Sequence, residues 1–132
     1  MISTRLLQTL SMAVLGACGI VALFAPEVLL SAISMAEITP HWPVQLLAAA
    51  WLALATFNWT TRGFTMGGIY GRPVVLTNFT FYFVAAASTL RPVLFAPRPG
   101  PLVVLVVFGV FAVAYGLLLF ARGPAAGADS RA

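Results

Sequence analysis

Four long apolar blocks dominate the chain, at residues 6–25, 44–61, 73–90 and 102–121, and none of them contains a charged residue. A helix rises about 1.5 Å per residue, so about 20 apolar residues cross the roughly 30 Å hydrocarbon core of a bilayer. The first and last blocks have that length, and the two central blocks lie near the short end of the spanning range. The pattern predicts an all-α, integral membrane four-helix bundle.

The connections between the blocks carry the turn-forming residues. Pro26 and Glu27 suit the first turn of a helix, because proline fixes φ and glutamate complements the positive end of the helix dipole. We expect a short helix there, lying in the membrane interface. Residues 91–101 hold four prolines and a glycine, so we expect a stiff surface turn without regular structure. The apolar stripe of the short helix would consist of Val28, Leu29, Ala32, Ile33 and Met35.

The first block has a second interpretation, as a lipoprotein signal in which Cys18 accepts the lipid. A mature lipoprotein normally becomes polar after its cleavage point, whereas this block stays apolar as far as Phe24. An uncleaved helix is therefore the preferred interpretation.

The composition excludes an ordinary water-soluble domain. The chain is 61% hydrophobic and 8% charged, with a mean hydropathy of +1.02, whereas soluble domains contain about 25% charged residues. A lipid-facing exterior removes the need for a polar surface. We expect one four-span domain over residues 1–121 and a disordered tail over residues 122–132.

The net charge of +4 comes from seven arginines, with no lysine, against three acidic residues. The arginines lie singly between the apolar blocks, which indicates membrane topology rather than a nucleic-acid-binding face. If all four blocks span, both chain ends and the central turn share one side. Most arginines would then lie on that side, so the positive-inside rule predicts that both termini are cytoplasmic. The arginines on that side are Arg5, Arg62, Arg72, Arg122 and Arg131, and those on the other side are Arg91 and Arg98.

Two amides interrupt the central blocks, Asn58 near the end of one and Asn78 near the start of the next. An unpaired amide in hydrocarbon costs several kcal/mol, so each side chain needs a partner. The preferred interpretation is that they join the second and third spans near the turn. The alternative is that they line a polar recess open to the cytoplasm.

The turn between these spans contains four of the glycines, Gly63, Gly67, Gly68 and Gly71. Gly63, Gly67 and Gly71 are spaced four apart, so a continued helix would carry a stripe without side chains. Each glycine costs a helix about 1 kcal/mol, however, and the adjacent glycines therefore favour a loop. Backbone N–H groups at the start of the next helix would then favour an anion such as a lipid phosphate. The alternative is that the arginines only set topology. The candidate ligand-binding residues are Asn58, Arg62, Tyr70, Gly71, Arg72 and Asn78.

The run Gly-Gly-Ile-Tyr-Gly-Arg-Pro at residues 67–73, preceded by Asn58 and followed by Asn78, resembles a motif of small four-span membrane proteins of the DoxX-like kind. The resemblance covers the second and third spans, and the rest of the chain matches only in hydropathy. It implies a bacterial cytoplasmic-membrane protein without a settled activity, and it assigns no functional residue.

These observations favour a non-enzymatic protein that binds a lipid, another hydrophobic ligand or a partner membrane protein near the central turn. The alternative is a small oligomeric transporter or channel for an ion or small solute. An enzyme is not expected, because no His, Cys or carboxylate pair is placed for acid–base chemistry. Cys18 and His41 are each the only residue of their type, so we expect no metal and no cofactor. The expected partners are membrane lipids and a second copy or another membrane protein, without nucleic acid.

Overall fold

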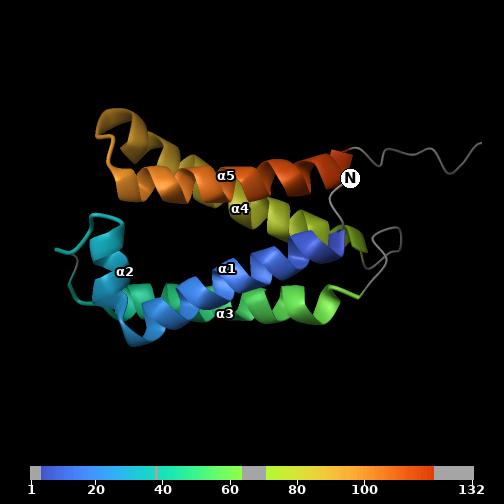
Figure 1. Ribbon diagram of the computed structural model, residues 1–132, viewed down its shortest axis with the longest axis horizontal. Helices are drawn as coiled ribbons and strands as arrows, with labels where there is room; N and C mark the ends of the chain where they lie inside the picture. Colours follow the sequence, from blue (N-terminus) through green and yellow to red (C-terminus); the bar gives the residue numbers. More distant parts are fainter. Residues whose placement is uncertain (1–3, 38, 64–70, 121–132) are drawn as a thin grey trace, which may run out of the picture.

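The computed structural model describes residues 4–37, 39–63 and 71–120, and all regular structure in these ranges is helical (Figure 1). The all-α fold class is therefore confirmed. Two antiparallel helix pairs make up the molecule, with α1 beside α3 and α4 beside α5, and α2 lies across one end. The helices are α1 (Thr4–Phe24), α2 (Pro26–Ala32), α3 (Trp42–Thr61), α4 (Gly71–Phe95) and α5 (Pro99–Phe120).

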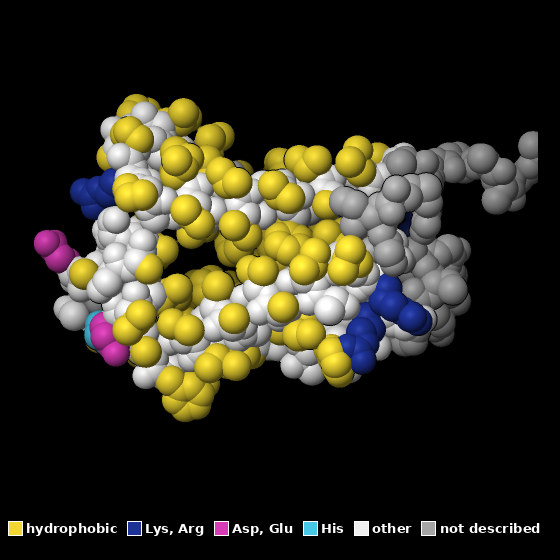
Figure 2. Space-filling model, viewed as in Figure 1, with side chains coloured by type: hydrophobic (Ala, Val, Ile, Leu, Met, Phe, Trp, Pro, Cys, Tyr) yellow, Lys and Arg dark blue, Asp and Glu magenta, His cyan; other side chains and the backbone are white. Residues whose placement is uncertain are grey.

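Within the described ranges, three helices are long and apolar enough to cross a membrane, namely α1, α4 and α5. On the face that Figure 2 shows, apolar side chains cover the length of the molecule and the charged side chains lie near its two ends. This distribution is that of a membrane protein with spanning helices. Helix α3 has 20 residues and is not one of these three, because its tryptophans and the amides of Gln45 and Asn58 lower its hydropathy.

The predicted boundaries of the first two spans agree with α1 and α3 to within a few residues. The prediction that residues 91–101 lack regular structure is wrong. Helix α4 continues through Arg91 and Pro92 to Phe95, and α5 begins at Pro99.

The prolines are tolerated because of their positions in the helices. Pro92 removes one N–H from the last part of α4, but the Ala96 N–H still donates to the Pro92 carbonyl at 2.9 Å and completes a further turn. Pro99 and Pro101 lie in the first turn of α5, where a backbone N–H has no partner within the helix in any case. The non-helical segment between α4 and α5 is therefore shorter than the number of prolines predicted.

The short helix predicted after the first span is confirmed as α2, with Pro26 at its start and Glu27 in its first turn. Its predicted apolar stripe stays a prediction, because a side of α2 that meets the membrane interface would be exposed on the surface of the bundle. The buried side chains of α2 are Pro26 and Leu30, whereas Val28 is 57% exposed. Pro26 and Leu30 therefore face the rest of the bundle, and Val28 faces outward.

Helix α2 and the start of α5 meet closely. A Cβ atom at Gly100 would clash with the backbone of Ala32 and Ile33, so only glycine fits there. The Arg98 Nη1 donates to the Ser34 carbonyl at 3.1 Å. We call these contacts the α2–α5 bridge; they join the two helix pairs at one end of the bundle.

An aromatic core joins the two pairs in the other half of the molecule. The fully buried Tyr82 ring stacks on Phe111, with centroids 4.7 Å apart, and on Tyr115 at 5.9 Å. Leu7 and Leu15 of α1 pack against this cluster. The bundle is therefore held together at two separated places.

Candidate functional site

Asn58 and Asn78 form a reciprocal pair between α3 and α4. Each Nδ2 donates to the other residue's Oδ1 at 2.8 Å, and Asn78 Nδ2 also donates to the Val74 carbonyl at 2.9 Å. Both side chains are 0% exposed. The prediction that these amides join the second and third long helices is confirmed. The alternative, in which they line an open recess, is wrong because neither side chain reaches the surface.

The amide pair extends to the first span through Ser11. Asn58 Nδ2 also donates to Ser11 Oγ at 3.0 Å, and the Ser11 hydroxyl lies 2.6 Å from that of Tyr82. A connected polar network therefore links α1, α3 and α4 inside the bundle. Sequence reasoning missed Ser11 and Tyr82, because the partners lie 71 positions apart and share no spacing motif.

Gln8 lies one turn before Ser11 on the same face of α1. Its Nε2 donates to Thr61 Oγ1 at 3.3 Å, and the Thr61 hydroxyl donates to the Phe57 carbonyl at 2.7 Å. Neither Gln8 Oε1 nor the Tyr115 hydroxyl, both buried, has a hydrogen-bond partner among the described residues. An unsatisfied buried group costs about 1–3 kcal/mol, so these two atoms are the weak points of the polar core.

Arg62 follows the last residue of α3, where a cation complements the negative end of the helix dipole. Its guanidinium carbon lies 3.1 Å from the centroid of the Trp59 ring, in a cation–π arrangement. Trp59 is 48% exposed, so the stacked pair lies on the surface of the bundle. Stacking keeps the guanidinium close to one position.

A second arginine, Arg5, completes an open depression of about 770 Å³ at this end of the molecule. Helices α1 and α3 run antiparallel, so the start of one lies beside the end of the other and the two cations share one surface. Figure 2 shows basic side chains at the end of the molecule opposite α2. Guanidinium and hydroxyl groups in a water-accessible depression are suited to binding an anion. The lining residues are Arg5, Thr9, Trp59, Thr60, Arg62 and Gly63.

The predicted ligand-binding residues do not lie together in the structure. Asn58 and Asn78 lie in the buried core, whereas Arg62 belongs to the surface depression. Gly71 is the buried first residue of α4, and Arg72 beside it is exposed. Tyr70, together with most of the glycine-rich turn, lies outside the described residues. Arg5, Thr9 and Trp59 were not predicted, because no sequence spacing relates the start of the first span to the end of the second.

The depression holds no acid–base or metal-ligating set. Within residues 4–37, 39–63 and 71–120, no three His, Cys, Asp or Glu side chains come together in a way that could hold a metal ion. The chemistry available in the depression is positive charge, hydroxyl groups and an indole face.

No protein-family model, no curated protein and no solved structure matches this chain. The resemblance to DoxX-like proteins therefore stays a prediction.

Proposed function

We propose that this chain is a non-enzymatic integral membrane protein that binds the phosphate of an anionic membrane lipid at the Arg5–Arg62 depression. The observation that carries the proposal is the pairing of two arginines from antiparallel helices over one open surface, with Trp59 stacked under one of them. The depression lies directly before the glycine-rich turn, where the sequence predicts ligand binding.

A lipid headgroup suits this surface better than an anion from bulk water. Guanidinium groups bind phosphate oxygens through paired hydrogen bonds, and tryptophan prefers the headgroup level of a bilayer. The depression borders the apolar faces of α1 and α3, so a lipid can place its phosphate there while its chains stay in hydrocarbon. Thr9 and Thr60 offer further hydroxyl groups.

The proposal includes α3 as a fourth span and cytoplasmic termini. Helix α3 is 20 residues long, runs antiparallel to the 21-residue α1 and packs along it, so a membrane that contains α1 also surrounds α3. The basic end of this pair would face the cytoplasmic leaflet, which is rich in anionic lipid. In a bacterium this is the cytoplasmic membrane.

The test compares single-charge variants at the two ends of the molecule. The protein is reconstituted in nanodiscs of phosphatidylcholine and phosphatidylglycerol, released into detergent, and its retained lipids are counted by native mass spectrometry. We expect Arg62→Gln to lower retained phosphatidylglycerol by about two- to fivefold, the effect of losing one partly exposed ion pair. Arg91→Gln, which removes an exposed arginine far from the depression, is the control. Equal retention in both variants would contradict the proposal.

A further inference from the structure

In the half of the bundle next to α2, helices α4 and α5 have few buried side chains. All buried residues of α4 lie between Gly71 and Tyr82, and none lies in residues 83–95. In α5, no residue of 102–110 is buried, although Pro101 and Phe111 on either side are. Over this stretch the α4/α5 pair buries no residue fully against the rest of the bundle, and Val107 and Phe108 are only partly buried against the aromatic core.

The other helix pair remains tightly packed over the same half. Ala22 and Ala48 are fully buried, and a Cβ atom at Gly19 would lie 2.9 Å from Leu52 Cγ. The two pairs are thus intact but separated from each other. Figure 2 shows the result as a hollow between α1 and α5, bordered by hydrophobic side chains.

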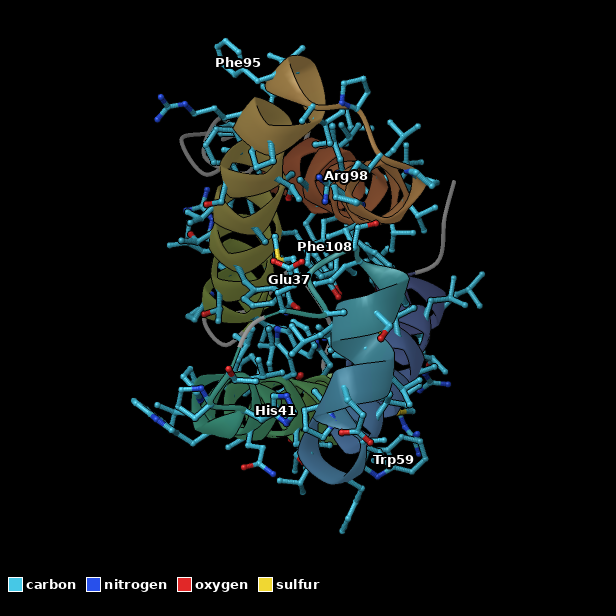
Figure 3. The ribbon with its side chains drawn as sticks, turned by 90° about the vertical axis from the view of Figure 1, so that its left-hand side faces the viewer. Glu37, His41, Trp59, Phe95, Arg98 and Phe108 are labelled. Carbon is cyan, nitrogen blue, oxygen red and sulfur yellow. The ribbon has the colours of Figure 1, made fainter. Side chains whose placement is uncertain are left out.

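The hollow has a wall at each end. On one side lies the aromatic core, from which Phe108 reaches toward the space between the pairs (Figure 3); its ring centroid is 5.6 Å from that of Tyr82 and 6.0 Å from that of Phe81. On the other side lies the α2–α5 bridge at Gly100 and Arg98. Because both ends are fixed by close contacts, the hollow is a defined feature of the fold.

The apolar walls of the hollow and its depth in the membrane determine what can fill it. Water is not stable between apolar walls, and an empty space loses dispersion contacts on every side. The spanning helices place this part of the bundle in the hydrocarbon layer, so a hydrocarbon chain is the available filling.

Arg98 supplies a positive charge at the end of the hollow next to α2. One N–H of its guanidinium donates to the Ser34 carbonyl, and a guanidinium carries five N–H donors in all, so Arg98 is also able to bind a phosphate. Viewed from the α2 end, both Arg98 and Phe108 lie at the gap between the helix pairs (Figure 3). We propose that an acyl chain of a phospholipid occupies the hollow between α1/α3 and α4/α5, with its phosphate bound by Arg98. This site lies at the opposite end from the Arg5–Arg62 depression and does not depend on it.

Photocrosslinking from inside the hollow tests the acyl chain. The protein carries p-benzoylphenylalanine in place of Phe108, is purified from phosphatidylcholine–phosphatidylglycerol nanodiscs into lipid-free detergent, and is irradiated. We expect a phospholipid adduct at position 108. The same probe in place of Val110, which is 64% exposed, should give detergent adducts only. Detergent adducts alone at position 108, or crosslinks only to other helices, would overturn the proposal.

A second measurement tests the headgroup contact and does not need the probe to fold. Native mass spectrometry counts the phospholipid retained by Arg98→Gln and by Arg91→Gln, two exposed arginines at the same end of the molecule. We expect about two- to fivefold less retained phospholipid in Arg98→Gln only. Equal retention in the two variants would overturn the role of Arg98. Loss through Arg62→Gln instead would locate all retained lipid at the depression.

Discussion

The side chains of Asn58 and Asn78 each donate to and accept from the other at 2.8 Å, so that two polar groups within the apolar bundle satisfy one another. This mutual arrangement resolves the cost of burying amides without water. It also makes each amide dependent on the other. Replacing one of them leaves the Oδ1 atom of the other without a donor, whereas replacing both removes both oxygens.

We therefore expect Asn58→Leu or Asn78→Leu alone to lower the free energy of unfolding by about 0.6–2 kcal/mol, because a buried amide loses its partner. The double variant should be less destabilised than the sum of the two single variants. Unfolding in mixed detergent micelles, followed by circular dichroism, measures all three. Gln45→Leu is the control, since Gln45 is an exposed amide of the same helix. Additive losses would show that the pair is not coupled.

The same variants bear on transport, the alternative to lipid binding. A conduction path that uses these amides would lose flux in both single variants. Flux into proteoliposomes by the folded variants measures this directly. We expect no specific loss, because neither amide reaches the surface.

The two stacked tyrosines give a matched comparison. The Tyr82 hydroxyl lies 2.6 Å from Ser11 Oγ, whereas the Tyr115 hydroxyl has no partner among the described residues. Tyr82→Phe should cost about 0.5–1.5 kcal/mol, the net value of one hydrogen bond. Tyr115→Phe should be neutral or stabilising, because it removes an unsatisfied buried group. Both variants keep the aromatic ring, so thermal unfolding in detergent compares the hydroxyls alone. The opposite order of stability would argue against this network.

Two glycines of α5 should respond differently to the same substitution. Gly100→Ala places a methyl group against the backbone of Ala32 and Ile33, and we expect a loss of about 1–3 kcal/mol. At Gly109 nothing lies within 4 Å of an added Cβ, so Gly109→Ala should leave stability unchanged or raise it by up to about 1 kcal/mol. Limited proteolysis around α2 provides a second measurement, because loss of the α2–α5 bridge exposes that segment. A stable Gly100→Ala protein would mean that the bridge is absent in the membrane.

The number of spans is open to a direct accessibility test. In a Cys18→Ser background, Gly63→Cys and Ala96→Cys each place one thiol at an exposed position near a helix end. If α3 crosses the membrane and the termini are cytoplasmic, a membrane-impermeant maleimide added to intact cells should label position 96 and not position 63. Permeabilised cells, in which both positions react, are the control. Labelling of position 63 in intact cells would contradict the proposed topology.

Hydropathy along the chain was sufficient for the four long helices, because each is a continuous apolar stretch of spanning length and helix formation is decided by neighbouring residues. The pairing of Asn58 with Asn78 was also predictable, since a buried amide requires a partner and these two flank one turn. Prediction failed at residues 91–95, where the effect of a proline depends on its place within a helix rather than on how many prolines are nearby.

The membrane class, the long helices and one polar contact could be predicted from the amino-acid sequence, because they follow from local composition and from the cost of unpaired polar groups in hydrocarbon. Three relationships became visible only in the folded bundle: Ser11 meets Tyr82, Arg5 shares one surface with Arg62, and the helix pairs separate around Phe108. Those relationships depend on which faces of distant helices come together, and that choice depends on side-chain packing across the whole bundle.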